Sequence, residues 1–392
     1  MKPGWVSSTL RTPMKPSRAM AALCALCSLH LHAEVLVPAV LEALHQLVPS
    51  HRNLFDWTDE QGRLLRYFIE GPIDSGIAQL YFDEFYNRRE AEVMPRFDSL
   101  PRQPPGVRGA DELNHAVFFQ SALYNEIWRP QGFHTRLEAV VRGRDQRLIG
   151  SLVLYRAPGD VRFTAEDERR LAAVLPALAA GLQASGPARA DDRHVPSPEP
   201  AETLLLTLQG QLQYASPGAH RLLLMAEGGA SRETLSRPLD TLAGRLLPML
   251  LKHLREQELA HGSTPSSLHG ARPTPPPSIT HETAAGQFVA SGRLLLPWQG
   301  AHEPLAEVTL LRLEPHRVAL ERALRTLPVS PGQMAVCRLL YLGHTHEQVG
   351  LQLGVASATV VDHVRKVHQA LDVRSALELR AVVDQRINTR PV

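Results

Sequence analysis

Four short segments near the C-terminus each join a helix-start signal to apolar residues at helical spacing. In Ser330-Pro331-Gly332-Gln333, the serine accepts from an orphan backbone N–H, the proline suits the first helical position, and the glutamine bonds back. Thr345-His346-Glu347-Gln348 repeats this pattern, and Gly354 suits the left-handed residue at a helix end. Ser357 begins the third segment, and Ser375-Ala376-Leu377-Glu378 reads as another capping box. The pattern predicts four consecutive helices.

The third of these helices is expected to be amphipathic. Its apolar residues recur at spacings of four, three and four, which places them on one face: Val360, Val364, Val367 and Leu371. Polar residues occupy the other face, which should point away from the core: Asp362, Arg365, Lys366 and Gln369. Two short helices joined by a tight glycine turn predict a helix-turn-helix, which places its second helix in the DNA major groove. The alternative is an ordinary helical hairpin within a larger bundle.

The fourth helix, Ser375–Ile387, carries more apolar residues than a three-helix core requires. Leu379, Val382, Val383 and Ile387 make it apolar along much of its length. This surplus predicts a surface that contacts a partner.

The first half of the chain alternates between helical and strand-like patterns. Apolar spacing and turn residues predict two helices and three strands: helices Val35–Val48 and Glu168–Leu182, and strands Leu64–Ile69, Arg136–Val141 and Leu148–Tyr155. Thr164 should cap the second of these helices. The mixed order predicts an antiparallel sheet flanked by helices.

A second strand-rich region follows residues 186–200, which are rich in proline and charge and read as a linker. Its predicted elements are strands Thr203–Leu208, Leu212–Ala215, Phe288–Pro297 and Leu305–Leu313, with a helix starting in Pro217–Leu224. Residues 262–278, full of Pro, Ser and Gly, are expected to form a disordered insertion.

Composition limits the class of protein. The chain has 392 residues, 44% of them hydrophobic and 21% charged, with a formal net charge of +2. This favours a soluble protein of two or three domains, and no apolar run is long enough for a membrane span. The three cysteines are an odd and sparse set, which fits a reducing cytoplasm. We therefore expect a cytoplasmic protein without a membrane partner.

Chemistry-bearing motifs are scarce. The sequence contains no G-x-S-x-G, H-E-x-x-H, P-loop or Rossmann glycine pattern, so we expect no catalytic residues, no enzyme activity and no cofactor. Cys24, Cys27, His30 and His32 offer thiolate and imidazole groups within nine residues, but one helix would spread them around its axis. We expect no metal site, although a redox or metal role for these four stays open.

The segment 327–379, which holds the four helix-start signals, resembles without a gap the DNA-binding domain of the LuxR family of bacterial transcription regulators. The resemblance implies a four-helix domain that binds double-stranded DNA as a homodimer. Its implied DNA-contacting positions are Thr345, Ser357, Thr359, Val361, Asp362, Arg365, Lys366 and Gln369. The chain departs from the family at Val361, where lysine is usual, and at Gln369, where a basic residue is usual. These departures weaken the expected grip on DNA phosphates.

The stretch from Ser121 to Leu178 resembles a GAF sensory domain as it occurs in front of LuxR-type domains, and the region after residue 200 resembles the opening of a PAS domain. The GAF resemblance implies a buried ligand or a partner surface. Aromatic residues supply its candidate ligand-binding walls: Phe118, Tyr124, Trp128 and Tyr155. The alternative for each ring is that it simply fills the core.

Together these features predict α+β sensory modules, built of antiparallel sheets flanked by helices, followed by an all-α four-helix helix-turn-helix domain. The expected divisions are an N-terminal tail and helix 1–33, a GAF-like domain 34–185, a linker 186–200, a PAS-like domain 201–316 and a DNA-binding domain 327–392. The expected function is a transcription regulator in which a small-molecule or protein signal controls dimeric operator binding. The alternative is a protein-interaction module that keeps this fold but sequesters another regulator.

Overall fold

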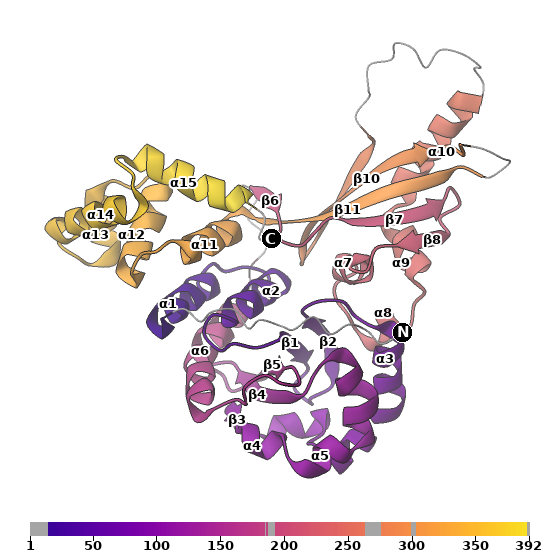
Figure 1. Cartoon of the computed structure of the whole chain (residues 1–392), viewed down its shortest axis with the longest axis horizontal. Helices are drawn as coiled ribbons and strands as arrows, with labels where there is room; N and C mark the ends of the chain where they lie inside the picture. Colours follow the sequence, from indigo (N-terminus) through magenta and orange to yellow (C-terminus); the bar gives the residue numbers. More distant parts are fainter. Residues whose placement is uncertain (1–14, 185, 187–192, 263–275, 299–302, 390–392) are drawn as a thin grey trace.

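The computed structural model describes residues 15–184, 186, 193–262, 276–298 and 303–389. The fold is mixed α/β, with two antiparallel sheets and many helices (Figure 1). The two sheets lie on different sides of the molecule, and a group of helices that includes the C-terminus forms a third region. Within the described ranges, no helix combines the length and apolar character needed to cross a membrane.

The first sheet has the strand order β2-β1-β5-β4-β3. Its strands are β1 (Arg52–Thr58), β2 (Leu64–Ile69), β3 (Gly106–Arg108), β4 (Thr135–Arg142) and β5 (Leu148–Arg156). Helices α2 (Ala33–Leu44) and α6 (Ala165–Gln183) cover one face, and α1 (Pro16–Cys27) packs against both of them. Short elements line the other face: α3 (Ser75–Leu80), η1 (Tyr81–Phe85), η2 (Arg89–Glu92), η3 (Phe97–Arg102), α4 (Ala110–Leu113), α5 (Ala116–Gln120), η4 (Leu123–Trp128) and η5 (Arg129–Gln131).

The sequence pattern located most of this sheet but missed strand β1, which lies between β2 and the central strand β5. Strands β2, β4 and β5 and the Thr164-capped helix α6 lie where the pattern predicts them. Strand β1 was not predicted because its sequence, RNLFDWT, carries the polar residues Asn53 and Asp56 among its apolar ones, and both are buried. Buried polar residues inside a strand remove the alternation from which a strand is recognised.

The second sheet repeats the same order, β8-β7-β11-β10-β9, with β6 paired to β11 in addition. Its strands are β6 (His194–Pro196), β7 (Glu202–Thr207), β8 (Leu212–Ala215), β9 (Ser278–Thr283), β10 (Gly286–Leu295) and β11 (Leu305–Pro315). The associated helices are α7 (Ala219–Ala226), α8 (Arg232–Leu235), α9 (Leu239–Leu246) and α10 (Pro248–Gly262). Strands β7, β10 and β11 bury alternate residues, as expected for a sheet packed on one face.

The interval 186–200 differs from the predicted linker. Residues 187–192 lie outside the described residues, but strand β6 occupies His194–Pro196 and pairs with the end of β11. Glu199 is held by Arg312 and Arg221, with N–O distances of 3.1 Å to each. Proline and charge suggested a free linker, whereas here the charge is buried and paired. Of the predicted insertion 262–278, residues 263–275 lie outside the described residues, and Ser278 already belongs to β9.

Five helices form the C-terminal region, one more than predicted. They are α11 (His316–Thr326), α12 (Pro331–Tyr341), α13 (His346–Leu353), α14 (Ser357–Leu371) and α15 (Ala376–Asn388). Helix α11 packs against α12 and α15, and its Leu320, Ala323 and Leu324 belong to the same apolar cluster. Val382 and Ile387 of α15 are partly buried against this cluster. Their apolar surplus, which predicted a partner surface, is therefore used largely inside the chain.

One helix start differs from the sequence pattern. Ser330 and Thr345 form reciprocal capping boxes as predicted, and α14 begins at Ser357 as predicted, although its N-cap Ala356 makes no side-chain capping bond. Ser375 accepts from the N–H of Glu378, while the Glu378 carboxylate accepts from the N–H of Arg374 rather than from Ser375. The Ser375 motif is thus a one-sided cap.

Helix α1 belongs to two separate apolar clusters. Leu23, Leu26 and Cys27 pack in the large cluster that continues through both sheets, whereas Ala22 packs in the cluster of the C-terminal helices. The Arg18 guanidinium donates to the carbonyl oxygen of Arg325 at 2.8 Å and also to that of Leu327. The N-terminal helix thus connects the first sheet to the C-terminal region.

Candidate functional site

The pair α13 and α14 is joined by a turn of three residues, 354–356. Gly354 adopts the left-handed conformation, with φ +65°, which glycine enters without steric cost. Gly350 allows close approach at the same junction, because a Cβ there would lie 3.0 Å from the Val355 carbonyl oxygen. The second helix therefore leaves the first at a sharp, fixed turn.

Helix α14 is anchored along one face and open on the other. Val360 and Val367 are fully buried and Val364 nearly so, because α14 packs against α12 and α13. The Arg365 and Lys366 side chains are 69% and 50% exposed. Figure 1 shows this helix at the end of the molecule opposite the second sheet. Its outer face is free of other parts of the described chain.

The residues predicted to contact DNA lie on one side of this region. Thr345, Ser357, Thr359, Val361, Arg365, Lys366 and Gln369 are exposed, and Asp362 is half-buried. Thr345 is also the N-cap of α13, where its hydroxyl accepts from the Gln348 N–H at 3.3 Å. Val361 is 53% exposed on α14.

Asp362 forms ion pairs with both cations beside it and offsets one of their two positive charges. Its two carboxylate oxygens lie 2.8 Å from Arg365 Nη2 and 2.6 Å from Lys366 Nζ. Hydrogen bonds from Lys366 and Arg365 lower the pKa of Asp362 to about 2. The outer face of α14 therefore presents a self-paired charge cluster rather than two free cations, which reduces its attraction for a polyanion.

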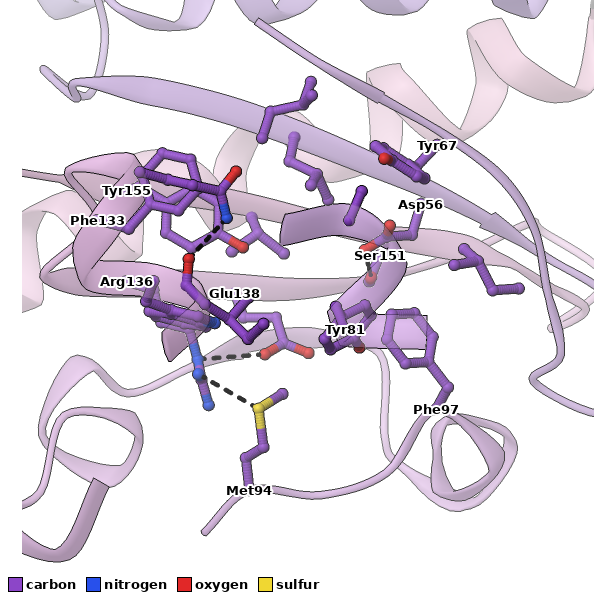
Figure 2. Close-up of a pocket in the computed structure, with 18 of the residues that line it drawn as sticks. Asp56, Tyr67, Tyr81, Met94, Phe97, Phe133, Arg136, Glu138, Ser151 and Tyr155 are labelled. Atoms are coloured by element: carbon purple, nitrogen blue, oxygen red, sulfur yellow. Dashed lines mark hydrogen bonds and ion pairs between the residues drawn. The ribbon is translucent and has the colours of Figure 1, made fainter. Parts of the chain in front are cut away.

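A cavity of about 130 Å³ lies under the first sheet (Figure 2). Its walls come from β1, β2, β4 and β5 and from the short elements opposite them. Of the four predicted wall residues, Trp128 and Tyr155 line the cavity, whereas Phe118 and Tyr124 lie behind the wall. Phe118 packs edge-on against both Trp128 and Tyr124, with centroids 4.7 and 5.6 Å apart. Two of the four predicted rings therefore line the cavity, and the other two lie behind them.

A buried guanidinium forms one side of the cavity. Arg136 is 1% exposed, and its guanidinium carbon lies 4.6 Å from the Trp128 ring centroid and 5.1 Å from that of Phe118. Glu138 Oε2 lies 3.7 Å from Arg136 Nε, and Arg136 Nη1 donates to Met94 Sδ at 3.6 Å. Burial lowers the pKa of Arg136 and the neighbouring Glu138 raises it. The cation is held by aromatic faces and one carboxylate.

The other side of the cavity carries a buried carboxyl group. The Ser151 hydroxyl donates to Asp56 Oδ2 at 3.1 Å, and both side chains are nearly inaccessible to solvent. Burial raises the pKa of Asp56 well above its ordinary value, against the lowering effect of the Ser151 hydrogen bond. This shift favours the neutral carboxyl group of Asp56 over its carboxylate. Figure 2 shows Asp56 with Ser151 apart from the group of Arg136, Glu138 and Met94.

Charged side chains connect the two sheets to the C-terminal helices. Arg322 of α11 bonds Glu314 at the end of β11 through both terminal nitrogens, and its Nε lies 2.8 Å from Glu42 of α2. Arg325 Nη2 lies 2.6 Å from the second oxygen of Glu42. Burial alone would lower the pKa of Arg322, but Glu42 and Glu314 raise it above its ordinary value. Helix α11 is thus fixed to both sheets.

Arg136, Asp56 and the ion pairs of Glu42 were not predicted from the sequence. A signal existed for the first, because β4 begins Thr-Arg-Leu-Glu and places two charged residues on one face of a strand that is buried on both faces. The ion pairs of Glu42 carried no comparable signal, since they join residues about 280 positions apart.

The four residues considered as metal ligands are not assembled into a site. Cys24 is exposed and Cys27 is buried on α1, and burial raises the pKa of Cys27 to about 12. Over the ranges that the structure describes, no group of three or more His, Cys, Asp or Glu side chains is placed to hold a metal ion.

Comparison with known proteins gives no family assignment. No protein-family model matches the chain, and no curated protein matches it. Among solved structures, a chain from the crystal structure of the E. coli DhaR(N)–DhaL complex aligns with 16% sequence identity. The alignment covers 76% of this chain and 88% of that chain, with a TM-score of 0.23. A similarity this low carries no argument about fold or function.

Proposed function

We propose that this chain is a DNA-binding transcription regulator of the bacterial cytoplasm, whose two sheet-containing modules couple a small-molecule or protein signal to operator binding by a homodimer. The observation that carries the proposal is the outer face of α14, which is exposed while its inner valines are buried. A helix fixed in this way after a tight glycine turn has the arrangement of the second helix of a helix-turn-helix. The resemblance of residues 327–379 to LuxR-type domains supports the same function.

The second support is a physical route between modules. Helix α11 joins the C-terminal helices and is bonded to α2 and β11 through Glu42 and Glu314. A signal acts on DNA binding only if it binds two arrangements of the protein with different affinity. The Glu42 and Glu314 contacts are the bonds that such a rearrangement would change.

The test is selection of a binding site from random duplex DNA by the full chain, followed by titration of that site with variants. We expect Arg365→Ala to weaken specific binding by roughly 1–3 kcal/mol, the usual worth of a good base contact. The matched control is Arg255→Ala, which removes an exposed arginine from α10 on a distant part of the molecule. Equal titrations of Arg365→Ala and the parent chain would contradict the assigned reading face.

A second candidate function is binding of another regulator in place of DNA. It is favoured by the pairing of Asp362 with both cations and by the exposed apolar Val361 and Leu351, which are 53% and 78% exposed. Asp362→Asn separates the two functions, because freeing Arg365 and Lys366 should strengthen DNA binding and steepen its salt dependence by about one counterion. A sequestering module would show no DNA binding with either residue at position 362.

A further inference from the structure

The cavity of the first sheet contains a cation whose hydrogen-bonding capacity is not filled. Within the described part of the chain, Arg136 Nε and Nη2 have no hydrogen-bond partner, although the side chain is 1% exposed. A buried donor without an acceptor costs free energy that the folded protein normally avoids. Arg136 lines the cavity, and Figure 2 shows its guanidinium directed toward Met94.

The carboxylate nearest to Arg136 is shared. Glu138 Oε2 lies 3.7 Å from Arg136 Nε, and Glu138 also accepts from Arg108 Nη2 at 2.9 Å, so one carboxylate serves two guanidinium groups. The buried carboxyl group of Glu90 is engaged elsewhere, since it accepts from the Tyr81 hydroxyl at 2.7 Å. Burial raises the pKa of Asp56, which favours its neutral form. The guanidinium of Arg136 therefore keeps donors that a second carboxylate can fill.

Most of the remaining cavity wall is apolar, and the cavity is small. Its walls include Ile69, Ile77, Ile127 and Val153, with aromatic rings such as Phe133 beside them. The volume of about 130 Å³ is close to that of an engineered apolar cavity of about 150 Å³ that admits benzene. The space therefore suits a single ring or a short branched chain.

We propose that this cavity binds a small monocarboxylate with an aromatic or branched aliphatic body, whose carboxylate accepts from Arg136 while the body packs on the apolar walls. A carboxylate matches the planar fork of a guanidinium, whereas inorganic phosphate has no apolar part to fill the remainder. The ligand's role as the signal rests on the proposed function. Binding itself does not, and it is measured without DNA.

The experiment is calorimetric titration of the full chain with benzoate and 3-methylbutanoate, and with benzyl alcohol and inorganic phosphate as comparisons. We expect at least one carboxylate to bind at least about tenfold more tightly than benzyl alcohol, because a charge-assisted hydrogen bond distinguishes them. Phosphate should bind no more tightly than benzyl alcohol. Equal binding of benzoate and benzyl alcohol, tighter binding of phosphate, or binding of neither carboxylate at millimolar concentration would overturn the proposal.

Two variants locate the site. Arg136→Met should reduce carboxylate binding at least about tenfold and leave benzyl alcohol binding unchanged or stronger. Ala78→Phe fills the cavity from α3 without touching the guanidinium and should reduce binding of both ligands. Arg129→Gln, an exposed residue next to the cavity but outside its lining, is the control and should bind as the parent chain does. Should Arg136→Met unfold, loss of carboxylate binding in Ala78→Phe still tests the site, and unchanged binding there overturns it.

Discussion

The two sheets share one strand order, but a buried arginine is paired with a carboxylate in the second sheet and is only partly hydrogen-bonded in the first. In the second sheet, Arg312 is 3% exposed and bonds Glu199 at 3.1 Å, and Arg221 and Ser197 also donate to that carboxylate. In the first sheet, Arg136 lies beside a cavity with two nitrogens unbonded. Strand order alone therefore does not decide whether a buried arginine is paired within the protein or keeps unbonded nitrogens beside a cavity.

The largest effect is expected at the fully paired site. Glu199→Gln removes the charge that Arg312 and Arg221 share and should lower the free energy of unfolding by about 3–5 kcal/mol, since it leaves two uncompensated guanidinium groups. Thermal and urea denaturation measure the change. A Glu199→Gln protein as stable as the parent would show that the second sheet does not depend on this pairing. It would contradict the stated difference between Arg312 and Arg136.

The same carboxylate gives this site a defined pH dependence. Burial opposes ionisation, but Arg312 and Arg221 lower the pKa of Glu199 to about 2. A lowered folded-state pKa stabilises the protein above the ordinary value of 4.5 and loses that contribution as pH falls toward 2. The acid-induced loss of stability between these values should therefore be smaller in Glu199→Gln.

An intermediate effect is expected where the sheets meet α11. Glu42→Gln should cost roughly 1.5–3 kcal/mol of stability, the usual worth of hydrogen bonds to charged groups, because it weakens the bonds to Arg322 and Arg325. The bonds from Arg322 to Glu314 remain, so α11 stays attached to the second sheet and loosens from α2. Hydrogen exchange should rise in α2 and α11 more than in β11. Unchanged exchange in α2 would contradict the assigned contact.

An effect of opposite sign is expected at the buried carboxyl group of the cavity. Asp56→Asn keeps an acceptor for the Ser151 hydroxyl and removes the ionisable group. Because burial raises the folded-state pKa of Asp56, the parent chain loses stability as pH rises above the ordinary value of 3.8. The variant should match the parent near pH 3 and be more stable at pH 7 in thermal melts. Lower stability at pH 7 would mean that Asp56 is ionised in the fold.

Local sequence patterns predicted many of the helices and strands, but they could not predict contacts between residues far apart in the chain. Capping residues and valine spacing located α12, α13 and α14 because those signals lie within one helix turn of the residues they organise. Helix α11 was missed, since its N-cap, Pro315, supplies no capping side chain, and its buried positions include the charged Glu321 and Arg325, which pair with residues on other helices. Strand β1 was missed for the same reason at Asn53 and Asp56.

The candidate cavity shows the same limit. Aromatic spacing suggested walls, and two of the four rings lie on them, but which rings support the wall and which face the space depends on packing between β5 and η4. The guanidinium of Arg136 was not singled out because a charged residue at the start of a strand usually reaches solvent. Its burial follows from the rings of Phe118 and Trp128 that cover it.

Neighbouring residues of α1 face different interiors, since Ala22 contributes to the C-terminal cluster and Leu23 to the cluster of the sheets. Successive side chains on a helix are separated by about 100° of rotation, so α1 can pack against the sheet cluster with one side and against the C-terminal cluster with another. Turning it to improve one contact necessarily spoils the other. The N-terminal helix therefore belongs to both apolar clusters, and a fragment that begins after it would lose part of each cluster at once.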